Sequence, residues 1–249
     1  MVTSQLPLWS DTDGAQGWVV RESRRARRLT VRVHHTGRVE VVVPLRTSST
    51  AVARFLDRHR GWIERKREEA QARAAPATPF PPLRIDVAAC EKSWRVHLTG
   101  GSRRARLSAR GDGLLVLSGD CSDGCTVRHA LRRWLTGYAV EVLGPALDRC
   151  ARELGFQYER VLIRRQRTRW GSCSTRGTIS LNCCLLFQRP PVVRYLMIHE
   201  LAHTAHMNHS RRFWQTVSRH CPDYRRLDRE LLDGWRRVPS WVFGDAGQT

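Results

Sequence analysis

The sequence lacks several features that define common classes of protein. No stretch approaches the roughly 20 consecutive apolar residues of a transmembrane helix, so no association with a membrane is expected. Residues 1–17 lack the basic start and apolar core of a secretory signal, and we expect them to form a disordered lead-in. The pattern G-x-x-x-x-G-K-[ST] of a phosphate-binding loop is also absent, as is an acidic cluster suited to magnesium.

The cysteines do not follow a metal-binding or disulfide pattern. None of the eight belongs to a C-x-x-C motif, and the pair Cys121 and Cys125 has no matching second pair. A second zinc site made of cysteines is therefore not expected. Because no secretory signal precedes them, we expect reduced thiols and a cytoplasmic protein.

Acidic residues are scarce relative to basic ones. The chain has 43 lysines and arginines against 23 acidic residues, a net charge of +20, and a surface of this charge attracts polyanions. The basic clusters lie at residues 21–28, 58–67, 101–106 and 163–170. Because they are spread along the chain, contact with nucleic acid stays a hypothesis beside the simpler alternative of solvated charged faces.

The first half of the chain is rich in strand patterns. Residues 28–44 alternate apolar and polar side chains around a turn near Thr36 and Gly37, which predicts a β-hairpin. Residues 47–74 predict an amphipathic helix, and a proline-rich break follows. Residues 93–119 predict three short strands that turn at Gly100–Gly101 and at 111–113.

The second half is mainly helical. A long helix is predicted over residues 123–155, followed by strand-like segments at 158–175 and 177–187 that join around Arg176 and Gly177. A helix begins at Pro190 and Pro191, and two further helices follow. Strands followed by helices predict an α+β fold.

The helix after Pro190 contains the sequence HELAHTAHMNH at residues 199–209. On a helix, His203 lies about 40° round from His199 and about 6 Å further along, so both imidazoles can reach one metal ion. Glu200 lies beside them, where it can take a proton from a metal-bound water. The pattern H-E-x-x-H is a signature of zinc hydrolases, mostly peptidases.

A catalytic zinc site needs a third protein ligand and an open position for water. His206 and His209 are the two nearby candidates. If the helix continued, His206 would share the face of His199 but would lie about 10 Å further along the axis. On the same continuing helix, His209 would point about 120° away from His203.

His209 becomes a ligand if the chain turns back after Met207. Asn208 tolerates a left-handed conformation and could form that turn, while Ser210 suits the start of a new helix. The spacing H-E-x-x-H-x5-H also matches that of metzincin peptidases, except that His206 stands at the place of their turn glycine. The spacing favours His209, and His206 then packs beside the ligands.

The run from 167 to 214 resembles the YgjP-like metallopeptidase family, a relative of the SprT-like proteins. The shared elements are RWGSCS at 169–174, the segment 177–182, HELAH at 199–203 and NHSRRFW at 208–214. Residues 21–44 and 59–70 also resemble the family's opening strands and helix, so the resemblance covers most of residues 18–220. It implies that His199, His203 and His209 bind zinc and that Glu200 is the catalytic base.

The order of the predicted strands and helices divides the chain into regions. We expect a β-rich N-terminal region with one helix at 18–119, a zincin-like metallopeptidase domain at 120–240 and a tail at 241–249. The strand segment before the helix is expected to border the cleft, where an extended peptide can pair with it. Further candidates for the cleft or for contact with the ligands are Arg169, Trp170, Asn182, His206 and Asn208. For Trp170 the alternative is packing in the core, and for Arg169 it is a structural ion pair.

Four functions are compatible with these residues. The first is a zinc-dependent peptidase that acts on proteins or peptides through a zinc-activated water. The second is a zinc-dependent nucleotide pyrophosphatase acting on UTP, and the third is a SprT-like protease associated with nucleic acid. The fourth is a binding module with a structural zinc, which a three-histidine site with an adjacent glutamate argues against. The sequence makes no prediction of oligomeric state.

Overall fold

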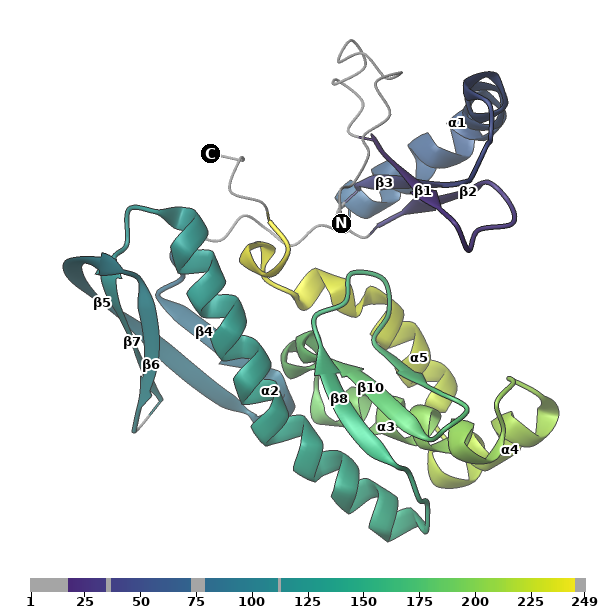
Figure 1. Cartoon of the computed structure of the whole chain (residues 1–249). Helices are drawn as coiled ribbons and strands as arrows, with labels where there is room; N and C mark the ends of the chain where they lie inside the picture. The colour runs from purple at the N-terminus through teal and green to yellow at the C-terminus, as the bar shows by residue number, and fades with distance from the viewer. Residues whose placement is uncertain (1–17, 35–36, 73–78, 112, 245–249) are drawn as a thin grey trace. The chain divides into compact units, whose positions relative to one another are not determined.

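The chain contains two compact units, Met1–Ala74 and Ala75–Thr249 (Figure 1). The structure is a computed structural model that describes residues 18–34, 37–72, 79–111 and 113–244. The division lies at the start of the predicted proline-rich break, inside the region 18–119. The boundary at residue 119, between the β-rich region and the metallopeptidase domain, stays a prediction. The predicted disordered lead-in at 1–17 lies outside the described residues.

The first unit is a small sheet with one helix. Its strands are β1 (Trp18–Ser23), β2 (Thr30–Val33) and β3 (Val39–Pro44), in the order β1-β3-β2, and its helix is α1 (Ser49–Ala72). Strands β2 and β3 pair antiparallel, which confirms the predicted hairpin, although Thr36 at its turn lies outside the described residues. The inward valines of β3 pack against the apolar face of α1 through Val52, Leu56 and Ile63.

The second unit begins with a four-stranded sheet. Its strands are β4 (Arg84–Val87), β5 (Lys92–Arg104), β6 (Arg106–Arg110) and β7 (Leu114–Asp120), in the order β4-β5-β7-β6. The turn predicted at Gly100–Gly101 was wrong, because both glycines lie within β5. The pairing of β5 with β7 shifts register between Thr99 and Arg104, as in a β-bulge, and the chain reverses only after Arg104.

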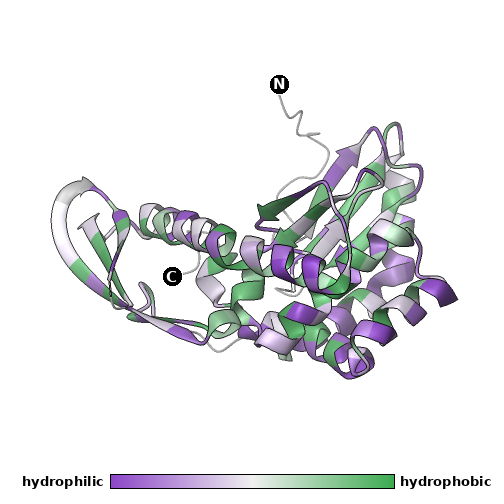
Figure 2. Cartoon of the chain, turned by 90° about the horizontal axis from the view of Figure 1, so that it is seen from below, coloured by the Kyte–Doolittle hydropathy of each residue, from purple (hydrophilic) through white to green (hydrophobic). Residues whose placement is uncertain are grey.

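A long helix packs against this sheet. Helix α2 (Gly124–Leu154) starts at Asp123, whose side chain accepts a hydrogen bond from the Cys125 N–H, and ends at Gly155 with a positive φ of 74°. Pro145 lies inside the helix. The buried face of α2 joins the core of the sheet through Leu131, Leu135 and their neighbours. The helices carry both hydrophilic and hydrophobic residues, as elements with one buried face do (Figure 2).

The remaining elements surround the HELAH segment. A three-stranded sheet contains β8 (Arg160–Arg164), β9 (Gly171–Cys173) and β10 (Thr178–Asn182), in the order β8-β10-β9. Three helices follow, namely α3 (Pro190–Ala205), α4 (Arg211–His220) and α5 (Tyr224–Asp233). Short 3-10 helices lie at Ala88–Cys90, Cys183–Phe187, Gly234–Arg237 and Ser240–Val242. The helices and three small sheets confirm the predicted α+β class. None of the described helices is long and apolar enough to cross a membrane.

Candidate metal centre

Helix α3 carries the whole H-E-x-x-H motif on one structural element. Pro190 and Pro191 occupy its first positions, as predicted, where the missing N–H of proline has no cost. The helix is buried on most sides, and Leu201 and Ala202 lie in the core. His199 and His203 therefore stand one helical turn apart on a rigid support.

The chain leaves the helix directly after this turn. Helix α3 ends at Ala205, and His206 is extended with φ −138° and ψ 97°. Bends at Met207 and Asn208 reverse the chain, and Ser210 then caps α4 by accepting a hydrogen bond from the Phe213 N–H. The reversal and the cap agree with the prediction. The left-handed conformation expected of Asn208 was wrong, because bends with ordinary φ values form this reversal.

The reversal brings His209 back to the two helical histidines. Nε2 of His209 lies 3.2 Å from Nε2 of His199. One ring nitrogen from each of His199, His203 and His209 can be chosen so that all three lie within 4.8 Å of one another. His206 is not part of this group. The structure thus brings together the three histidines that the spacing favoured.

The backbone of His206 orients His203. Nδ1 of His203 lies 3.0 Å from the His206 carbonyl oxygen, so this nitrogen is assigned as the N–H donor and Nε2 keeps its lone pair. Burial lowers the pKa of His203, and burial together with the neighbouring histidines lowers the pKa of His199 to about 4. Both rings are therefore neutral at pH 7, the form that binds a metal ion.

Aromatic side chains of α4 form the wall behind the histidines. The ring of Phe213 is fully buried, with its centroid 5.0 Å from His199, 4.5 Å from His203 and 4.7 Å from His209. The ring of Trp214 lies 5.6 Å from that of His209. These contacts restrict the rotamers of the histidines, which keeps the three rings together.

Glu200 faces β9 from the same helix. The residue is 3% exposed, and its Oε2 atom has no hydrogen-bond partner within the described part of the chain. Burial raises the pKa of Glu200 to about 8, against the opposing effect of the Arg169 charge. A β carbon built on Gly171 would lie 2.4 Å from Oε1 of Glu200, so only glycine leaves space for the carboxyl group. The carboxyl group is thus held between α3 and the first residue of β9.

The other predicted cleft residues have different surroundings. Asn182 is fully buried, its amide nitrogen donates to the carbonyls of Gln166 and Arg169, and its amide oxygen accepts from the Cys184 N–H. It therefore holds the loop before β9, and the amide nitrogen is bonded to two backbone carbonyls of that loop. Trp170 packs in the core, with its ring 4.0 Å from that of Trp235. Arg169 is exposed, with its charge close enough to affect Glu200.

Several residues of the site were not predicted. Gly171, Phe213 and Trp235 carried no assigned role, although Gly171 and Phe213 lie inside the segments RWGSCS and NHSRRFW. Gly171 meets Glu200 across 29 residues of sequence and Trp235 meets Trp170 across 65, and no local pattern contains that information. Phe213 lies only 14 residues from His199, but its contact depends on how α4 packs against α3. For Gly171 and Phe213 the signal available was their position within segments shared with the family, whereas Trp235 lies outside those segments.

A comparison with known protein families identifies the family of the chain. Residues 27–233 match the family described as YgjP-like, metallopeptidase domain. The chain is therefore a member of the YgjP-like metallopeptidase family, as the resemblance had indicated. A crystal structure of the metallopeptidase zymogen of Pyrococcus abyssi abylysin is 26% identical, covering 39% of this chain and 98% of that chain with a TM-score of 0.35. A comparison with curated proteins gave no match.

Proposed function

We propose that this metallopeptidase uses zinc, held by His199, His203 and His209, and that Glu200 is its general base. The observation that carries the proposal is the convergence of three imidazole nitrogens within 4.8 Å, beside a buried carboxyl group. Structural zinc sites are usually closed by four ligands that include cysteine, whereas three histidines leave a position open for catalysis.

The residues fit a zinc ion in their chemistry and spacing. Two nitrogens bound tetrahedrally to zinc lie about 3.3 Å apart, given Zn–N distances of about 2.0–2.1 Å. The corresponding distance between Nε2 of His199 and Nε2 of His209 is 3.2 Å. Oε2 of Glu200, a buried polar atom of the site, has no hydrogen-bond partner among the described residues. A donor set of neutral imidazoles suits zinc better than magnesium or calcium.

The residues around the metal position supply the proton transfers. When bound, zinc supplies a Lewis acid that activates water and polarises a carbonyl group near neutral pH. Glu200 takes a proton from the attacking water and delivers it to the nitrogen of the leaving amine. This role needs the carboxylate form, and a nearby divalent cation lowers the pKa that burial alone raises. The charge of Arg169 also lowers the pKa of Glu200.

Strand β9 is the part of the fold suited to hold a peptide. Among the described strands, β9 pairs only with β10, which leaves its other edge free. Its first residue, Gly171, is the residue that contacts Glu200. An extended peptide added to this edge would lie beside the proposed base, with main-chain hydrogen bonds providing affinity. We therefore infer that the substrate binds in an extended conformation.

Metal analysis beside peptide cleavage tests the proposal. The purified wild-type protein should contain one zinc ion per chain, and His209→Ala should lose both metal and activity. His206→Ala should keep its metal, because the contact to His203 comes from the backbone carbonyl of residue 206. Glu200→Gln should keep the metal and lose about 10²–10⁴-fold in kcat, the usual contribution of a general base.

Two outcomes would contradict the proposal. Full activity in Glu200→Gln would exclude Glu200 as the base, and unchanged metal content in His209→Ala would exclude His209 as a ligand. The same preparations incubated with UTP test the alternative hydrolase. Release of pyrophosphate that depends on Glu200, without cleavage of any peptide, would assign the site to nucleotides instead.

A further inference from the structure

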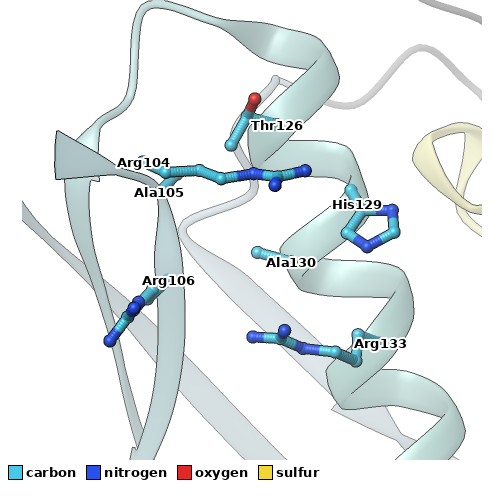
Figure 3. Close-up of a pocket in the computed structure, with 7 residues that line it drawn as sticks. All are labelled: Arg104, Ala105, Arg106, Thr126, His129, Ala130 and Arg133. Atoms are coloured by element: carbon cyan, nitrogen blue, oxygen red, sulfur yellow. The ribbon is translucent and has the colours of Figure 1, made fainter.

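A second polar site lies on elements that contribute nothing to the metal centre. A pocket of about 190 Å³ is enclosed between the end of β5, the start of β6 and the first turns of α2. Its polar lining consists of Arg104, Arg106, Thr126, His129 and Arg133. In Figure 3, Arg104 extends from the strand towards α2 and Arg133 extends from α2 towards the strands.

These arginines lack the partners that neutralise other arginines of the chain. Arg189 and Arg194, for example, each form an ion pair with a carboxylate at 2.6 and 2.8 Å. Arg104, Arg106 and Arg133 form no such pair within the part of the chain that the structure describes. Exposed like charges around one pocket repel one another only weakly in water, and together they attract an anion.

The sequence around the pocket extends this positive charge. Residues 92–111 contain six basic residues and no acidic one, and no acidic residue lies between 124 and 140. The nearest carboxylates in the sequence are those of Asp120, which stands opposite Arg104 in the pairing of β5 with β7, and Asp123. Asp120 accepts hydrogen bonds from Ser122, and Asp123 accepts them from the Thr126 hydroxyl and the Cys125 N–H. These hydrogen bonds lower the pKa of Asp123, with a smaller contribution from the Arg104 charge. Asp123 thus caps α2, Asp120 is bound by Ser122, and neither carboxylate forms an ion pair with the pocket's arginines among the described residues.

The size of the pocket restricts the group that it can hold. Sites for whole small molecules usually measure about 300–1,000 Å³, so a pocket of about 190 Å³ suits one compact anionic group. Arginine binds phosphate through several N–H donors at once. The positive charge extends along both segments that border the pocket. A ligand with repeated negative charges matches this distribution better than a single ion does.

We propose that the pocket between β5, β6 and α2 binds a phosphate group of a nucleic-acid backbone, through Arg104 and Arg133. Arg106 and His129 border the same pocket and contact the neighbouring part of the ligand. The contact is independent of base sequence, because it involves the phosphodiester group alone. The proposal does not rest on the identity of the metal or on the role of Glu200.

Binding of a labelled oligonucleotide to the full chain tests this site. Fluorescence anisotropy with single-stranded DNA at several salt concentrations compares wild type, Arg104→Ala/Arg133→Ala and a control, Arg149→Ala/Arg229→Ala. All four arginines are exposed, and each double variant removes two positive charges. The pocket variant should bind at least about tenfold more weakly, and its salt dependence should decrease by about 0.7 for each phosphate that it no longer binds. The control should change affinity about threefold or less.

The control and a competitor decide between the alternatives. Equal losses in the two double variants would overturn the site, because binding would then depend on the total charge of +20. Pyrophosphate is the second probe, and it should displace the oligonucleotide only weakly. Pyrophosphate that binds through Arg104 and Arg133 as tightly as the oligonucleotide would overturn the assignment to nucleic acid in favour of a free phosphate compound. Thermal unfolding of each variant checks that the fold is retained.

Discussion

The metal centre and the basic pocket are built in opposite ways. At the metal centre, His199, His203 and His209 lie within eleven residues of sequence, against a buried aromatic wall. The pocket gathers Arg104 and Arg133 from a strand and a helix, and both side chains are exposed. The first site is thus local in sequence and runs from the buried His203 and Glu200 to the exposed His209, whereas the second is assembled by tertiary structure and solvated.

This difference determines what each site contributes to the protein. Buried polar groups cost free energy unless a partner or a metal ion compensates, so the metal centre couples folding to function. Exposed charges are solvated and cost little, so the pocket can lose its arginines without loss of the fold. Substitutions should therefore affect stability and catalysis at the first site and only binding at the second.

The largest effect on stability is expected at the aromatic wall. Phe213→Ala removes a fully buried ring that contacts all three histidines, and should lower the free energy of unfolding by about 3–5 kcal/mol. Denaturant unfolding of the metal-free protein measures this loss separately from metal binding. Phe213→Leu, which keeps most of the volume, should cost clearly less. Equal stability of wild type and Phe213→Ala would show that the wall does not support the site.

The next effect concerns the position of the proposed base. Gly171→Ala places a methyl group where Glu200 now lies, and should lower kcat/KM about 10–100-fold by displacing the carboxyl group. Metal content should stay at the wild-type level, because no histidine is touched. Gly137→Ala is the matched control, since a β carbon there meets nothing within 4 Å. Wild-type activity in Gly171→Ala would mean that β9 and Glu200 are not tightly packed.

A smaller effect is expected from the ion pair that holds the start of α3. Arg189 donates two hydrogen bonds to Glu230, at 2.8 and 2.6 Å, and this contact lowers the pKa of the Glu230 carboxyl group. The stabilisation is present above the ordinary glutamate pKa of 4.5 and is lost as the pH falls through the lowered pKa of the folded state. Glu230→Gln should cost about 0.5–1 kcal/mol at pH 7, because Arg189 is half exposed.

Unfolding curves of wild type and Glu230→Gln at several pH values test this expectation. The difference in free energy of unfolding should shrink as the pH falls below about 4.5, since the carboxyl group then becomes neutral in both states. A difference that stays constant as the pH falls well below the ordinary glutamate pKa of 4.5 would show that the pair contributes by packing rather than by charge.

The smallest effect is expected at the basic pocket. Arg104→Ala/Arg133→Ala should change the free energy of unfolding by less than about 0.5 kcal/mol, because both side chains are exposed and unpaired among the described residues. Denaturant unfolding measures the change in free energy of unfolding, and a peptide-cleavage assay measures activity. A loss of stability comparable to that of Phe213→Ala would show that the two sites contribute equally to folding.

Local patterns predicted much of the fold and the centre of the site. The proline start of α3, the reversal before His209 and the Ser210 cap follow from residue types within one or two turns of helix. The hairpin of β2 and β3 and the long helix α2 follow from periodicity. The exceptions are Gly100 and Gly101, which form an irregularity in β5 instead of a turn. Glycine permits either outcome, and pairing with β7 decides between them.

The sequence by itself determined that His199, Glu200 and His203 share a helix, because helical geometry fixes which side chains lie together at a spacing of three or four residues. Only the tertiary structure decided that Gly171 lies against Glu200, that Phe213 supports the histidines and that Asn182 holds a loop. It also decided that arginines about 30 residues apart surround one pocket. Such contacts depend on how strands and helices pack in three dimensions, and this packing reflects the burial of the whole core rather than any short segment.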